Sequence, residues 1–132
     1  GNIRFKSDQF KFGGFTWNPL QAHIVLKDNM TEITLDEARL CGIAMPGVIQ
    51  LTPSTITFDV EPFAEEQELE PSKTCLVGET VHADGRYQLK GRIQGKGSPG
   101  HLLEATTGQV DGTAVSGRIY HNFVLLKVSN LT

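Results

Sequence analysis

The sequence predicts a mainly β protein of the α+β class, built as an antiparallel curved sheet of short meandering strands. Two or three short helices are expected beside the sheet, including one at the C-terminus. Apolar and polar residues alternate over the first sixty positions, as in strands with one buried face. Turn residues interrupt this alternation at short intervals, and one segment near residue 70 carries helix start and stop signals. These three observations predict the fold class.

The first third of the chain predicts an antiparallel hairpin. Leu20, Ile24 and Leu26 lie on one face of the first strand. Asp28-Asn29 provides the turn, after which the alternation resumes at Ile33 and Leu35. Two shorter strands follow the break at Pro46-Gly47 and are separated by a turn at Pro53-Ser54. Their apolar positions are Ile49 and Leu51 in the first, and Ile56, Phe58 and Val60 in the second.

Further strands are expected in the second half of the chain. Residues 81–93 alternate around a turn at Asp84-Gly85, and their apolar face holds Tyr87, Leu89 and Ile93. Residues 109–120 form a strand rich in Thr, Ala and Gly, whose glycines indicate close packing or bulges. The sheet is therefore expected to continue almost to the C-terminal tail.

Three segments have helical features. Pro71-Ser72 can begin a helix over 70–77, and Gly78 follows it as a C-cap residue. Residues 101–106 have room for one or two helical turns. The tail 122–131 has Phe123 and Leu126 near helical spacing, with Asn122 as an N-cap, and predicts the C-terminal helix.

The chain of 132 residues fits a single domain, 1–132, with no internal linker. It lacks a signal peptide and any apolar run of the roughly 20 residues that would cross a bilayer. Because it begins at Gly1 and alternates at once from Ile3 to Lys6, we expect a fragment of a longer protein. The formal net charge of −3, with mixed signs, disfavours nucleic acid as a partner.

The motifs of catalysis and cofactor binding are missing. The four histidines are isolated in the sequence, so no metal site is expected. A phosphate-binding loop around Lys96 would need Gly at 90 and Ser or Thr at 97, where the chain has Lys90 and Gly97. No G-x-S-x-G elbow presents a nucleophilic serine. The sequence therefore predicts a protein that is not an enzyme and binds no cofactor.

Cys41 and Cys75 are too few for a zinc site. They are either two buried thiols or one disulfide. Free cysteine packs as a small hydrophobic residue, and without knowledge of the compartment this favours the buried thiols. The compartment decides between the two readings.

An amphipathic sheet must bury its apolar face against a core or a ligand. Alternation selects thirteen positions that would line a groove for an apolar chain, although each of them also suits an ordinary core. The alternative is a capping or docking module with a closed core and no ligand, which binds a partner through the aromatic segment Phe10, Phe12, Phe15 and Trp17. The candidate lining residues are Leu20, Ile24, Leu26, Ile33, Leu35, Ile49, Leu51, Ile56, Phe58, Val60, Tyr87, Leu89 and Ile93.

Five short motifs, in order along residues 19–132, carry a family resemblance. They are Ala38-Arg39-Leu40-Cys41-Gly42-Ile43, Thr74-Cys75-Leu76, Tyr87-Gln88-Leu89-Lys90-Gly91, Gly117-Arg118-Ile119-Tyr120 and Leu125-Leu126-Lys127-Val128. With these motifs the chain resembles the C-terminal region of bacterial AsmA-like proteins, which take part in outer-membrane biogenesis.

The resemblance implies a strand-rich periplasmic region of a protein anchored in the inner membrane by a part outside this chain. It also implies an amphipathic β-groove that conducts phospholipid, or another ligand with acyl chains, toward the outer envelope. Other segments of the parent chain would be its partners. In the periplasm disulfides persist, so the resemblance favours a bond between Cys41 and Cys75.

Overall fold

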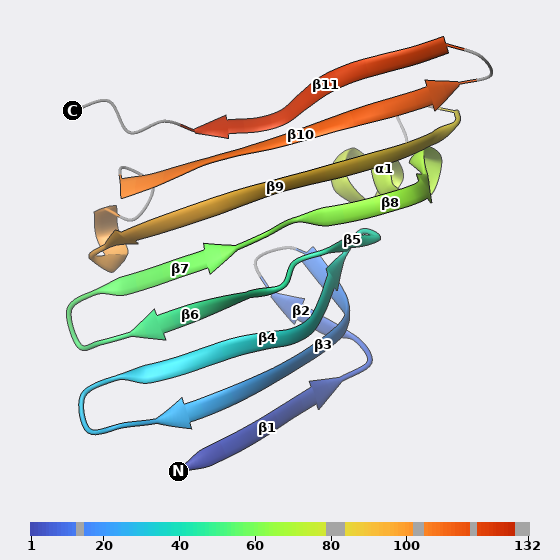
Figure 1. Cartoon of the computed structure of the whole chain (residues 1–132). Helices are drawn as coiled ribbons and strands as arrows, with labels where there is room; N and C mark the ends of the chain where they lie inside the picture. Colours follow the sequence, from blue (N-terminus) through green and yellow to red (C-terminus); the bar gives the residue numbers. More distant parts are fainter. Residues whose placement is uncertain (13–14, 79–83, 102–104, 117–118, 129–132) are drawn as a thin grey trace.

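The computed structural model describes residues 1–12, 15–78, 84–101, 105–116 and 119–128. Within these residues eleven strands form one antiparallel sheet, and one α-helix packs against it (Figure 1). The predicted mainly β fold is confirmed. No helix among the described residues is long and apolar enough to span a membrane. The elements are β1 Asn2–Ser7, β2 Phe10–Phe12, β3 Phe15–Leu26, β4 Thr31–Leu40, β5 Ile43–Ala44, β6 Gly47–Leu51, β7 Ile56–Val60, β8 Phe63–Glu68, α1 Leu69–Val77, β9 Arg86–Gly97, the 3-10 turn η1 Pro99–His101, β10 Thr106–Ser116 and β11 Ile119–Val128.

The sheet is an up-and-down meander. Some strands that follow each other in the chain share a row, which means that both pair with the same neighbouring strand. β1 and β2 both pair with β3, so they lie end to end along one edge. β5 and β6 both pair with β4, while β7 and β8 both pair with β9. β10 and β11 complete the sheet beyond β9. Apart from the strands that share a row, chain neighbours pair with each other, as the alternation and its turns predict.

Interruptions of the strand pairing form a line that crosses the sheet from strand to strand. Pro46 and Pro62 interrupt the two shared rows, because proline has no N–H to donate to a ladder. The N–H of Glu61 bonds to the carbonyl of Pro46, and the N–H of Gly91 bonds to that of Pro62. Register shifts continue the line into β3–β4 and β10–β11. Such bulges bend a sheet locally.

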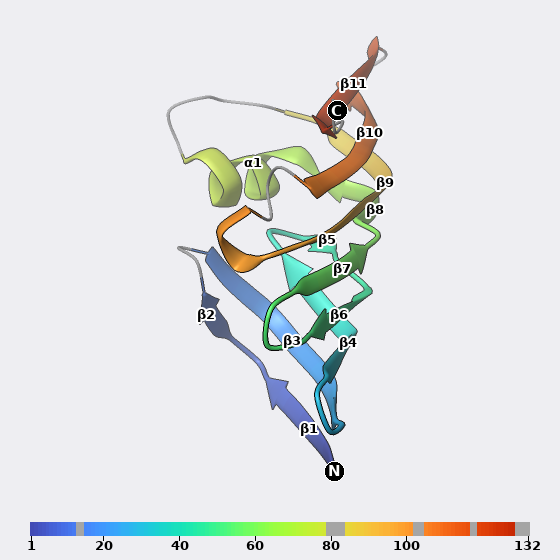
Figure 2. The same cartoon turned by 90° about the vertical axis from the view of Figure 1, so that its left-hand side faces the viewer.

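This line divides the sheet into two halves. We call the part with β5 and β8 the covered half, and the part with β6 and β7 the open half. Each includes the segments of β4 and β9 that pair with those strands and the adjoining segments of β3 and β10. α1 lies on one side of the sheet, and β2 lies on the same side (Figure 2). α1 packs on the covered half, because its Leu69 and Leu76 contact the buried cluster there.

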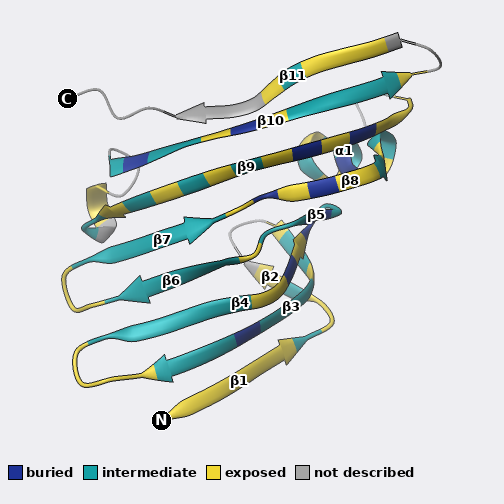
Figure 3. Ribbon diagram, viewed as in Figure 1, coloured by how far each residue is buried: buried dark blue, intermediate teal, exposed yellow. Residues whose placement is uncertain are grey.

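The buried cluster lies beneath α1, where the deeply buried residues of β8, β9 and β10 meet (Figure 3). Tyr87 carries a hydroxyl into this cluster, and it forms a hydrogen bond of 2.6 Å with the Ser72 hydroxyl on α1. A disulfide between Cys41 and Cys75 fixes α1 to the turn between β4 and β5. The cluster consists of Ile43, Ala64, Tyr87, Leu89 and Val110.

The helix predicted over 70–77 is confirmed as α1, which spans Leu69–Val77. Pro71 lies in its first turn, where a missing N–H removes no intrahelical bond. Gly78 ends it with a φ of 90° and donates its N–H to the Thr74 carbonyl at 3.0 Å. A residue with a side chain is strained at that φ, so glycine suits the helix end.

We expect Tyr87→Phe to lower the free energy of unfolding by roughly 1 to 3 kcal/mol, because it leaves the buried Ser72 hydroxyl without its partner. Ser72→Ala should have a similar effect. The double variant should lose less than the sum of the two, since both single changes break the same bond. Urea unfolding of the three variants measures this coupling, and additive losses would show that the hydrogen bond contributes nothing.

The predicted C-terminal helix is wrong, because residues 119–128 form strand β11. A register shift explains the misleading spacing. Val110 pairs with Leu126 and Gly112 pairs with Phe123, so a bulge inserts one extra residue in β11. Phe123 and Leu126 of β11 are three residues apart, yet they pair with residues of β10 that are only two apart. The extra residue gives these positions of β11 the spacing expected of a helix. The residues 129–132 lie outside the described part of the chain.

Other details also differ from the prediction. The expectation of two or three short helices is wrong: within the described residues the chain has one α-helix and the 3-10 turn η1. Strands β3 and β9 have 12 residues each, so the strands are not uniformly short. The strand expected over 109–120 is divided between β10 and β11. Of the strand pair expected around Asp84-Gly85, residues 81–83 lie outside the described residues, as do 102–104 of the helical turn expected over 101–106.

Candidate functional site

The pairing register places the thirteen candidate lining residues on one face of the sheet. Ile24 pairs with Ile33, Ile33 with Ile49, and Ile49 with Phe58. Directly paired residues share a face, and side chains alternate along each strand, so the other candidates follow from these. Tyr87 identifies the face as the one that carries α1. Along this row, β3, β4, β6 and β7 present aliphatic and aromatic side chains side by side.

Exposure separates these thirteen residues into three groups. Tyr87 and Leu89 are only 4% exposed, because they lie in the cluster beneath α1. Leu26 is exposed at the end of β3, and the other ten are half-buried (Figure 3). α1 is the only α-helix in the part of the chain that the structure describes, and it packs on the covered half. The apolar face of the open half is therefore partly accessible to solvent.

The prediction missed two residues of this face. Ile3 pairs with Ile24 and Phe5 pairs with Ala22, so β1 extends the apolar surface to the edge of the sheet. Both are more than a third exposed. Their alternation with Asn2, Arg4 and Lys6 is the sequence signal that identifies them.

The opposite face of the open half is mainly polar. The Gln50 side chain donates a hydrogen bond to Glu32 at 3.2 Å. Across β7 and β9, the Arg92 guanidinium donates to Asp59, with 2.9 Å between Nε and Oδ1. Val48 is an exception, because its pairing with Asp59 places it on the polar face. The sheet thus has one apolar and one polar face, as required of a single layer with one side in water.

The hydrogen bond from Arg92 holds the pKa of Asp59 below its ordinary value of 3.8. A carboxyl whose pKa is lower in the folded state stabilises the fold above its unfolded pKa. That contribution disappears as the pH falls through the folded pKa, so it operates fully at neutral pH. Because the pair is exposed, solvent screens it and its effect on stability is small.

The aromatic segment forms the corner of the sheet next to the apolar face. Phe10 pairs with Trp17, and Phe12 pairs with Phe15 through the β2–β3 ladder. The rings of Phe5 and Phe10 meet edge to face with centroids 5.4 Å apart. Phe15 is 42% exposed. The segment is thus part of the sheet and does not form a separate module.

Cys41 and Cys75 form a disulfide with 5.4 Å between their Cα atoms. Cys41 lies in the β4–β5 turn, where its φ of 54° is left-handed. Cys75 is on α1 and is exposed. The bond closes a loop of 34 residues in sequence separation that contains β5, β6, β7 and β8, and it fixes α1 to the β4–β5 turn of the covered half.

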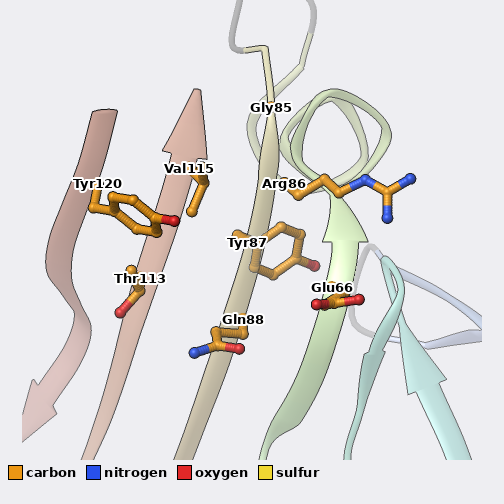
Figure 4. Close-up of a pocket in the computed structure, with 8 residues that line it drawn as sticks. All are labelled: Glu66, Gly85, Arg86, Tyr87, Gln88, Thr113, Val115 and Tyr120. Atoms are coloured by element: carbon orange, nitrogen blue, oxygen red, sulfur yellow. The ribbon is translucent and has the colours of Figure 1, made fainter. Parts of the chain in front are cut away.

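A depression of about 520 Å³ lies at the end of β9 and β10 (Figure 4). Its charged lining residues are Glu66 and Arg86, which come from β8 and β9, and Tyr120 and Thr113 line the other side. Across the described residues, no three His, Cys, Asp or Glu side chains gather as metal ligands would. The wall of this depression mixes charged, polar and apolar side chains.

No protein-family model, curated protein or solved structure matches the chain.

Proposed function

We propose that the chain is a non-enzymatic segment of an AsmA-like envelope protein and that the open half of its sheet carries acyl chains of phospholipid in transit to the outer membrane. One observation supports this above others: the thirteen candidate residues share a face, ten of them remain half-buried, and the one α-helix of the described residues packs on the covered half. A polar face on the other side keeps the sheet in water.

The size of the open half suits this role. Five residues of β6 or β7 extend about 17 Å at roughly 3.3 Å per residue, and six rows from β1 to β9 span about 24 Å at roughly 4.8 Å per row. Such an area, roughly 400 Å², is as large as the main apolar patch of a typical monomer, and patches of this kind are often binding sites. At about 25 cal/mol per Å², covering it would contribute roughly 10 kcal/mol before the losses of association.

The proposed mechanism is passive. Apolar burial has no preferred direction and depends mainly on the area removed from water, so an acyl chain can slide from one aliphatic side chain to the next with little change in free energy. The disulfide supports a periplasmic location, because such bonds persist in oxidising compartments. The membrane anchor of the parent protein would lie outside this chain.

Two neighbouring residues of β6 allow a matched test. Ile49 lies on the apolar face and Val48 on the polar face, and both are half-buried and β-branched. We expect the chain, exported to the periplasm and purified without detergent, to carry phospholipid. Ile49→Lys should lose most of it, because a charged group would then occupy the acyl path. Val48→Lys should retain it. Mass spectrometry of lipid extracts gives the amount per chain.

Phe58→Lys, with Thr57→Lys as its control in β7, repeats the comparison on the next strand. A folded wild-type chain without lipid would contradict the proposal, as would equal losses from both members of each pair. The first of these results would favour the capping or docking module, in which a protein partner covers the apolar face.

A further inference from the structure

We propose that α1 is a disulfide-latched lid and that the cluster beneath it is a covered extension of the apolar site. The identity of the ligand, an acyl chain, rests on the proposed function, whereas the lid itself does not. Opening the latch would join the covered and open halves into one apolar surface.

The two halves are already continuous along β9. Tyr87 and Leu89 lie beneath α1, and Ile93, on the same face of the strand, pairs with Val60 in the open half. Ile93 also packs against the buried cluster. Gly91, between Leu89 and Ile93, adds no side chain that would separate them. An acyl chain on the open half would thus meet an apolar path that α1 blocks.

Besides the disulfide, α1 is held to the sheet by hydrogen bonds and by two leucines among the described residues. It has nine residues, which is shorter than the length at which an isolated helix becomes stable in water. Ser72 is its one buried residue, and it bonds to Tyr87. The N–H of Leu69 bonds to the Gly85 carbonyl at 2.9 Å. Leu69 and Leu76 are only partly buried against the cluster. The bond to Cys41 is the one covalent cross-link between α1 and the sheet.

The latch is accessible to a small thiol. Cys75 is exposed, and a depression of about 320 Å³ beside Cys41 is lined by Glu66, Glu68 and Arg86 among others. One thiolate of a dithiol reductant attacks a sulfur of the Cys41–Cys75 bond and forms a mixed disulfide with it. Its second thiol then displaces that cysteine. The dithiol ends as a disulfide, and two electrons and two protons have passed to the two cysteines.

Hydrogen exchange tests the lid on the intact chain. We expect a dithiol to lower the protection of the α1 amides by more than that of the β9 and β10 amides, which should lose no more than the fall in the global free energy of unfolding that the broken bond causes. The Cys41→Ala/Cys75→Ala variant should behave like the reduced chain. As a control, the reduced chain is bridged again with a bis-alkylating reagent, which restores a covalent link that a dithiol cannot cleave. This chain should match the oxidised one.

Lipid capacity tests the covered extension. After incubation with phosphatidylethanolamine vesicles, the reduced chain should hold roughly twice the phospholipid of the oxidised or bridged chain, because capacity follows the apolar area exposed. Unchanged exchange of α1 on reduction would overturn the lid, and so would a loss of protection in β9 and β10 as large as that in α1. An open lid with unchanged lipid capacity would overturn the extension.

The outcomes separate this inference from the proposed function. If the oxidised, bridged and reduced chains all bind no lipid, the proposed function and the extension fail, while the exchange data still decide whether α1 is a lid.

Discussion

Leu89→Asp is expected to unfold the chain or to leave it barely stable. Leu89 is 4% exposed and lies within the cluster beneath α1. An aspartate there would hold either a desolvated charge or a buried acid, and both cost several kcal/mol. The whole free energy of unfolding of a domain of this size is about 5 to 15 kcal/mol. Circular dichroism should show loss of the cooperative thermal transition.

Gln88→Asp is the matched control. Gln88 is the preceding residue of β9, pairs with Thr113 and is exposed on the polar face. The same side chain there remains in water, so we expect a loss of about 1 kcal/mol or less, mainly from the poor strand propensity of aspartate. Equal destabilisation by both changes would mean that the two faces of β9 do not differ as described.

The sequence was sufficient to predict which residues share a face. Ile33, Ile49 and Phe58 come from three strands, yet alternation within each strand and the turns between them determine their pairing. A shift of one residue would move a whole strand's apolar set into water, which makes the register strongly specified. The same reasoning, applied to Ile3 and Phe5, would have extended the face to β1.

Alternation could not predict what covers that face. Tyr87 and Leu89 follow the same pattern as Ile93, but α1 buries the first two and leaves the third only partly buried. The position of α1 depends on long-range contacts, above all the bond between Cys41 and Cys75, and local propensity contains no information about them. For the same reason β11 was mistaken for a helix, because its bulge arises only when it pairs with β10.

Breaking the Cys41–Cys75 bond is expected to lower the free energy of unfolding by roughly 3 to 4 kcal/mol. The bond links residues 34 apart in sequence, and a loop of this size restricts the unfolded chain by about that amount in the chain-entropy model. Urea unfolding of the oxidised, reduced and Cys41→Ala/Cys75→Ala chains measures the change. A loss below about 1 kcal/mol would show that the unfolded state is little affected by the link.

The slope of the same urea curves gives independent information about α1. The slope m increases with the surface exposed on unfolding. If α1 lifts from the sheet when the bond is broken, the folded chain already exposes Tyr87, Leu89 and Val110, so less surface remains to be exposed and m falls. A broken bond also frees the unfolded chain to expand, which by itself would raise m. A lower m in the reduced chain therefore requires the folded state to have opened. A higher m with the same loss of stability places the effect in the unfolded state and leaves α1 on the sheet.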